Sequence, residues 1–168
     1  MNFSVNVGMV IFAASWGLVG ARAQAVSFCD LVPASAVAST LGITVVLVAK
    51  PDADDPNRCD YKGQGNSPSV DVVALSTLDA GFTKTLADSR FANMSSSAGE
   101  ERVSGIGDAA IYWNRVNLQL GMLIRTKGKY VTFTVSTYNA KGLPKDAILS
   151  LGRLIVSKPL DTLKYPQS

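Results

Sequence analysis

The side chains that most often carry acid–base and metal chemistry are sparse in this sequence. None of the 168 residues is a histidine, which removes the usual general base, the usual zinc ligand and any Ser-His or Cys-His pair. Neither Gly-x-Ser-x-Gly nor Ser-x-x-Lys occurs, so two common signatures of a serine nucleophile are missing. The sequence therefore predicts no catalytic residue, no metal ligand and no cofactor.

Two groups of acidic residues bear on that conclusion. Asp52, Asp54, Asp55 and Asn57 offer oxygen ligands for calcium, but Pro56 takes the place of the flexible glycine, and no glutamate closes the loop. A solvated acidic loop is the favoured interpretation. The pair at positions 100–101 is Glu-Glu, and adjacent strand residues point to opposite faces. A shared carboxylate site is therefore not expected there.

A glycine-containing turn is expected to organise the second half of the chain. Gly105 and Gly107 lack a Cβ atom and can adopt positive φ, and the Asp108 carboxylate can cap the turn. Gly-x-Gly also opens a dinucleotide fingerprint, but the third glycine is absent and the next residues are typical of a strand. We predict a structural turn at Gly105, Gly107 and Asp108 that leads into a strand ending near Trp113.

Two hairpins follow from the alternation of apolar and polar residues after this turn. A two-residue turn at Asn114-Arg115 would place Trp113 opposite Val116 and Ile111 opposite Leu118. In this register Trp113 belongs to the core, which is favoured over a role as a ligand platform.

The second hairpin is expected to turn at Lys127-Gly128. That turn would place Ile124 opposite Val131, Met122 opposite Phe133 and Leu120 opposite Val135.

These two registers define a candidate binding face on the side of the strands away from the core. Its expected members are polar but hardly charged: Tyr112, Asn117, Gln119, Leu123, Arg125, Tyr130, Thr132, Thr134 and Ser136. Such side chains suit an uncharged polar partner, either a glycan or a protein surface. The alternative is that this is only the wetted side of an antiparallel sheet.

The N-terminal residues 1–23 are expected to be a cleaved signal peptide. Residues 5–20 are almost entirely apolar and precede Ala21-Arg22-Ala23 and Ala23-Gln24-Ala25, both of the small-x-small type. The mature chain would begin at Gln24 or Val26, and a membrane anchor is the alternative. The charges of the mature chain are scattered and nearly balanced, so nucleic acid is not an expected partner.

Cys29 and Cys59 are the only cysteines. In an exported protein such a pair is most simply one disulfide. A lipid-modified Cys29 is the alternative, but Phe28 occupies a position where a small residue is required.

Periodicity predicts an α+β fold with an antiparallel sheet of about six strands and helices on one face, in the order α-β-β-β-α-β-β-β-α. The first helix should end at Gly42, the second should span 79–92 with Leu78, Phe82 and Leu86 on one face, and the last should contain Leu143 to Leu154. One domain is expected over 24–156, followed by a loosely attached tail at 157–168.

Several of these residues together resemble a known family. They are Cys29-Asp30-Leu31-Val32, Leu41-Gly42, Cys59-Asp60-Tyr61 and Val103-x-Gly105-Ile106-Gly107-Asp108-x-Ala110. The pattern is similar to that of small secreted bacterial domains, often lipoproteins, whose function is largely unassigned. The resemblance implies an extracytoplasmic, cystine-containing α+β domain and no catalytic residues.

The sequence thus favours a secreted or periplasmic, monomeric and non-catalytic domain that binds an unknown protein or a neutral polar ligand. It would have no stable membrane insertion after signal cleavage. A histidine-independent hydrolase and a structural protein of the cell envelope are the alternatives.

Overall fold

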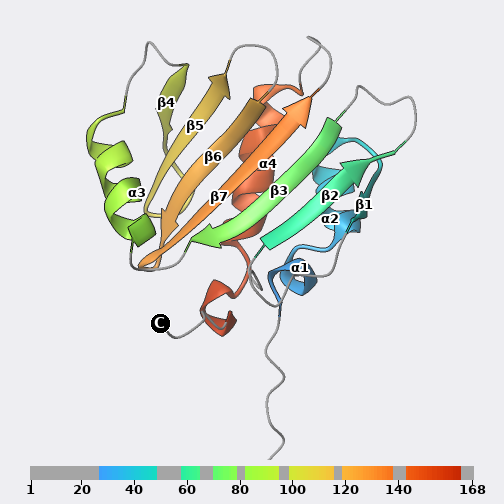
Figure 1. Cartoon of the computed structure of the whole chain (residues 1–168), viewed down its shortest axis with the longest axis horizontal. Coiled ribbons are helices and arrows are strands. Elements are labelled where there is room, and N and C mark those ends of the chain that lie inside the picture. The colour runs from blue at the N-terminus through green and yellow to red at the C-terminus, as the bar shows by residue number, and fades with distance from the viewer. Residues whose placement is uncertain are drawn as a thin grey trace, which may run out of the picture.

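The fold is α+β and is built on one antiparallel sheet of seven strands in the order β1-β2-β3-β7-β6-β5-β4 (Figure 1). It is taken from a computed structural model. The structure describes residues 27–48, 58–64, 70–78, 82–94, 99–115, 119–137 and 143–163. The expected signal peptide and the acidic loop at 52–57 lie outside these ranges.

The strands are β1 (Val45–Leu47), β2 (Arg58–Gly63), β3 (Val70–Leu78), β4 (Glu100–Val103), β5 (Ala109–Arg115), β6 (Gln119–Thr126) and β7 (Lys129–Thr137). The helices are α1 (Phe28–Leu31), α2 (Ala34–Leu41), α3 (Phe82–Ala92) and α4 (Lys145–Val156), with a final 3₁₀ turn at Leu160–Thr162.

Helices cover both faces of the sheet. On one side, here called the α4 face, residues such as Met122 and Phe133 pack against α1, α2 and α4 in the main core. Figure 1 shows these three helices on one side of the sheet. On the other side, here called the α3 face, α3 packs over a smaller cluster. The buried members of that cluster are Ala87, Phe91, Ile111, Trp113, Leu123 and Tyr130.

This arrangement corrects three parts of the expected architecture. The sheet has seven strands because Glu100–Val103 pairs with β5 as an additional edge strand. A short helix, α1, precedes the expected first one. The expectation that helices cover one face only is wrong, because α3 covers part of the opposite face.

The second hairpin has the expected register. Ile124 pairs with Val131, Met122 with Phe133 and Leu120 with Val135. The connecting residues Lys127 and Gly128 have φ values of 47° and 75°. Positive φ at both central positions is the geometry of a two-residue turn that matches the twist of the strands.

The expected register of the first hairpin is wrong. Trp113 pairs with Gly121, Tyr112 with Met122 and Ile111 with Leu123. Asn114 and Arg115 are themselves paired, with Leu120 and Gln119, so the turn is not at Asn114-Arg115. Residues 116–118 lie outside the described residues. Because the register differs by an odd number of residues, Ile111 and Trp113 lie on the α3 face and Tyr112 lies on the α4 face.

The ends of two helices follow the sequence. Gly42 ends α2 with a φ of 67°, in the left-handed region that favours glycine. Pro33 and Pro144 immediately precede α2 and α4 as their N-caps. The expected apolar face of α3 is wrong, because Leu86 is 54% exposed while Phe91 is buried.

The described part of the C-terminal segment is packed against the domain. Leu160 and Leu163 are buried and belong to the main core. The expectation of a loosely attached tail from residue 157 onward is therefore wrong as far as Leu163. Two leucines three residues apart on a 3₁₀ turn share one side and can bury together.

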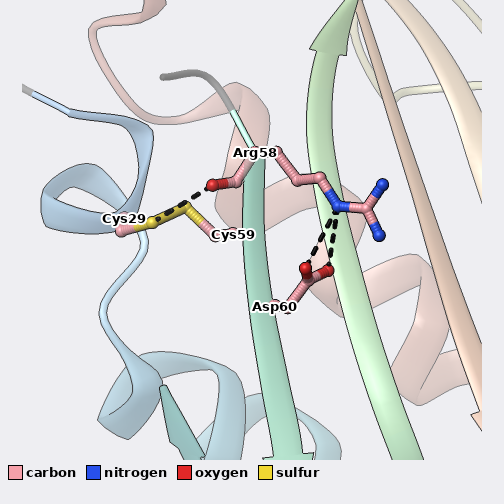
Figure 2. Close-up of polar contacts among 4 residues, drawn as sticks. All are labelled: Cys29, Arg58, Cys59 and Asp60. Atoms are coloured by element: carbon pink, nitrogen blue, oxygen red, sulfur yellow. Dashed lines mark hydrogen bonds and ion pairs between the residues drawn. A yellow bond between two sulfur atoms is a disulfide. The ribbon is translucent and has the colours of Figure 1, made fainter. Parts of the chain in front are cut away.

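The N-terminal helix is fastened to the sheet at two points. Cys29 and Cys59 form the expected disulfide (Figure 2). Two residues further along β2, on the same face, the Tyr61 hydroxyl donates a hydrogen bond to the carbonyl oxygen of Val32. Burial raises the pKa of this phenol well above its ordinary value, and the negative charge of Asp60 raises it further. The Cys-x-Tyr spacing thus places the side chains of Cys59 and Tyr61 on the same face of β2.

Candidate binding face

The α3 face gathers most of the residues that the sequence nominated for binding. Tyr130, Thr132 and Thr134 alternate with the buried Val131, Phe133 and Val135 on β7, and Gln119 and Arg125 alternate likewise on β6. Two nominated residues are not placed there. Tyr112 lies on the α4 face, and Asn117 is outside the described residues.

The central part of this surface is lined with hydroxyl and amide groups. We call Gln119, Thr132, Thr134 and Ser136 the hydroxyl face. Gln119 pairs with Ser136, and Gly121 pairs with Thr134. Gln119 is exposed, and the three hydroxyl residues are half-buried. None of the four carries a charge, so these side chains offer a partner hydrogen-bonding groups only.

These hydroxyl groups retain capacity for hydrogen bonding. The Thr132 hydroxyl donates to the carbonyl oxygen of Met122 at 3.3 Å, which leaves its lone pairs as acceptors. Within the described part of the chain, no hydrogen bond joins the Thr134 or Ser136 hydroxyl to another side chain. Each hydroxyl can donate one hydrogen bond and accept others. No base among the described side chains is bonded to them, so the arrangement suits binding and offers no activated nucleophile.

An ion pair on β2 lies on the same side of the sheet, with β3 between it and the hydroxyl face. Arg58 and Asp60 lie on the strand face opposite the buried Cys59, and the Arg58 Nε atom is 3.1 Å from the Asp60 carboxylate (Figure 2). Through the backbone registers of β2, β3 and β7, Asp60 is aligned with Thr134. Two strand spacings separate them, which is about 10 Å.

Trp113 borders the hydroxyl face on its other side, together with the end of α3. The guanidinium of Arg90 lies 4.7 Å from the centre of the indole ring and forms an ion pair with Glu100. Arg115 adds a longer contact of 3.9 Å to the same carboxylate. The indole ring covers Gly121, where a Cβ atom would meet it at 2.6 Å. A stacked guanidinium and a paired, nearly buried carboxylate fix the ring in place.

A second network joins α3 to the sheet at Tyr130. Its hydroxyl donates to the Asp88 carboxylate at 2.6 Å, and Arg125 lies 3.8 Å from the same carboxylate and over the Phe91 ring. Tyr130 is buried. It therefore holds the helix in place and does not serve as an open contact for a ligand.

Tyr112 has a comparable structural role on the α4 face. It is buried, and the ammonium of Lys145 lies 5.5 Å from its ring centre while pairing with Glu101. Burial raises the pKa of the Tyr112 phenol, with Lys145 acting in the opposite direction. Glu100 and Glu101 thus point to opposite faces, as strand geometry requires, and each has its own cationic partner.

The predicted structural turn is present. Gly105 and Gly107 have φ values of 74° and 61°. Asp108 does not cap its own turn, because its carboxylate accepts a hydrogen bond from the backbone N–H of Lys127 at 2.8 Å, while its own N–H donates to the Arg125 carbonyl oxygen. The turn is thereby tied to the β6–β7 hairpin.

The sequence reasoning missed the two side-chain networks that anchor α3. Arg90 and Asp88 were not singled out, because each is an ordinary polar residue of an exposed helix. The charged run Glu100-Glu101-Arg102, read as a strand, would have indicated that Glu100 and Arg102 share one face. Arg102 donates a hydrogen bond to the Phe91 carbonyl oxygen at 2.5 Å on that face.

No three histidine, cysteine, aspartate or glutamate residues in the described part of the chain come together in a way that could hold a metal ion. No described helix is long and apolar enough to cross a membrane. Comparisons with protein-family models, with curated proteins and with solved structures found no match to this chain.

Proposed function

We propose that this protein is an exported, non-catalytic binding domain and that its hydroxyl face recognises a neutral glycan. The observation that carries the proposal is the row of Thr132, Thr134 and Ser136 beside Gln119, on the part of the sheet next to the α3 cluster. Sugar hydroxyl groups donate and accept hydrogen bonds, and these side chains do the same.

The chemistry of this surface favours a glycan over a protein partner. Protein interfaces concentrate binding energy in aromatic and arginine anchors. Trp113 and Tyr130 are buried on this face, and Arg90 is engaged with Glu100. The side chains of the hydroxyl face that remain for a partner are uncharged hydrogen-bonding groups, which suits a neutral saccharide.

Export is supported by the disulfide between Cys29 and Cys59. Disulfides form and persist in oxidising compartments and are rare in the cytosol. The apolar N-terminal residues and the resemblance to secreted bacterial domains point the same way. We therefore place the mature protein outside the cytoplasm.

The test is a glycan array followed by titration of the bound oligosaccharides. The variant Thr132→Val/Thr134→Val keeps the shape and the β-branching of the side chains while it removes two hydroxyl groups. We expect binding of at least one neutral saccharide, weakened about tenfold or more in the double variant, because each lost hydrogen bond is worth roughly 1 kcal/mol and leaves a ligand hydroxyl unpaired.

Thr40→Val is the matched control, since it removes a hydroxyl group from α2, where Thr40 bonds to the Ala36 carbonyl oxygen. Binding should be unchanged in this control. A chain that binds no neutral saccharide, or that binds equally well as the double variant, contradicts the proposal. Selective binding of a purified envelope protein would instead favour the protein-partner alternative.

A further inference from the structure

The two edges of the sheet differ sharply in character. One edge is β4, whose residues Glu100, Glu101 and Arg102 are charged. The other edge is β1, and Thr44 to Val48 contains no charge. Charges on an edge strand prevent pairing with another strand, and an uncharged, β-branched edge lacks that protection. Among the strands that the structure describes, β1 is therefore the edge without charged residues.

Exposed apolar side chains are concentrated on the same edge. Val46, Leu47 and Val48 are 38%, 40% and 56% exposed. Within the described residues the remaining large exposed apolar side chain is Leu86 on α3. Val46 and Val48 share one side of the strand direction and Leu47 lies on the other, so both sides of this edge expose an apolar side chain. A single exposed leucine such as Leu86 is ordinary.

The backbone of β1 also has unused hydrogen-bonding groups. The Val48 N–H donates to the Asp60 carbonyl oxygen and the Gln64 N–H donates to the Thr44 carbonyl oxygen. In an antiparallel ladder these groups alternate in direction. The N–H and C=O groups of Val45 and Leu47 therefore point away from β2, toward the side on which the described sheet has no further strand.

We propose that β1 pairs antiparallel with β1 of a second copy of this chain and so forms a two-fold symmetric dimer with a continuous sheet. This inference does not depend on the proposed ligand. In the pairing, Val46 faces Val46 of the second copy, and Val45 faces Leu47 of the second copy. Every outward N–H and C=O group of Val45 and Leu47 then has a partner.

The segment is complementary to itself in this register. Each cross-strand pair joins two uncharged residues, mostly β-branched, which are favourable neighbours in a sheet. The sequence has no charged residue from Leu31 to Ala49, so no like charges meet across the axis. A symmetric contact of this kind closes after two copies and does not propagate into a fibre.

The test is sedimentation equilibrium of the exported full-length protein over a range of concentrations up to about 1 mM, which covers weak association. We expect a reversible dimer. Val46→Lys places two ammonium groups opposite each other across the axis and should raise the dissociation constant about tenfold or more. Val46→Glu should have the same effect through its carboxylates.

A mixture of the Val46→Lys and Val46→Glu proteins provides the decisive comparison. Opposite charges now meet, so the mixture should dimerise at least as well as the unchanged protein. Leu86→Lys is the control, because it replaces another exposed apolar residue, on α3, and it should leave the dissociation constant unchanged.

Leu47→Pro tests the backbone separately from the side chains. Proline removes the N–H that points away from β2, so the β1–β2 ladder keeps its hydrogen bonds. The variant should melt close to the unchanged protein but should not dimerise. The proposal is overturned by a protein that stays monomeric throughout the concentration range, and equally by a dimer that persists in Val46→Lys and Leu47→Pro.

Discussion

At the scale of single residues, Gly107 shows why a glycine is needed in the turn before β5. A Cβ atom there would lie 2.5 Å from the carbonyl oxygen of Arg125 and 2.9 Å from the Ile124 side chain. At Gly105 the φ is similarly positive, but nothing lies within 4 Å of the same position. A substitution at Gly105 therefore tests backbone strain alone, whereas a substitution at Gly107 adds a steric clash.

We predict that Gly105→Ala lowers the free energy of unfolding by about 1 kcal/mol through its positive φ alone. Gly107→Ala should cost distinctly more, because a backbone oxygen cannot move aside as a flexible side chain can. Urea unfolding of the two variants measures the difference. An equal loss of stability in the two variants would mean that the clash between the added Cβ atom and the Arg125 carbonyl oxygen is relieved without a cost in free energy.

Tyr61 is the residue at which pH should act on stability. Burial raises the pKa of its phenol in the folded protein above the ordinary value of 10.0. Above about pH 10 the unfolded chain loses this proton while the folded chain retains it. Fewer protons bound in the unfolded state mean that the free energy of unfolding decreases as pH rises.

We therefore predict that stability is insensitive to Tyr61 ionisation below about pH 9 and declines above pH 10. Tyr61→Phe should reduce this decline, although it also removes the hydrogen bond to Val32 and so starts from a lower stability. Urea unfolding between pH 8 and 11 compares the slopes. An identical slope in the variant would assign the decline to other groups.

At the scale of elements, the sequence predicted the second hairpin because only one face of β7 is fully apolar. Val131, Phe133 and Val135 alternate with polar residues, and Lys127-Gly128 fixes the turn. The first hairpin gives no such signal. Residues 110–113 are all buried, since α3 covers one face of β5 and α4 the other. Alternation cannot determine a register where both faces are covered.

The position of α3 could not be predicted for a related reason. Among the described side chains of α3, the buried apolar ones are Ala87 and Phe91, and Arg90 and Asp88 add polar contacts to the sheet. Polar residues of this kind look like the solvated side of a helix. Their partners, Glu100 and Tyr130, are distant in the sequence.

We predict that Trp113→Ala lowers the free energy of unfolding by roughly 3 kcal/mol or more. The change removes the ring between Gly121 and Arg90 and leaves the nearly buried Glu100 with a poorly ordered partner. Chemical denaturation measures the loss. Leu86→Ala is the control on the exposed side of α3 and should change stability by less than about 0.5 kcal/mol.

At the scale of the whole molecule, the Cys29–Cys59 disulfide joins α1 to the sheet across 30 residues. Closing a loop of this length lowers the entropy of the unfolded chain and thereby stabilises the folded protein by about 3 to 4 kcal/mol. We predict that replacing both cysteines with serine lowers the free energy of unfolding by that amount. Non-reducing peptide mapping of the unchanged protein should recover one cystine peptide, and two free thiols would contradict the assignment.

The alternation of polar and buried residues along β6 and β7 made part of the candidate site predictable from the sequence. The polar residues of β7 and β6 were identified correctly as one surface, because their alternation with buried residues is regular. The tyrosines were grouped with them only because the helix over Tyr130 and the changed register of Tyr112 were unknown. Removing these two leaves a smaller surface without aromatic contacts.

We propose that this smaller surface, and not the tyrosines, is the binding site. The most direct measurement is a ¹⁵N-edited NMR titration of the exported protein with the neutral oligosaccharide that the array identifies. We predict that amide shifts change at Gln119, Thr132, Thr134 and Ser136 and stay constant around Tyr112 and along α4. Changes centred on Tyr112, on α4 or on β1, with none in β7, would contradict it.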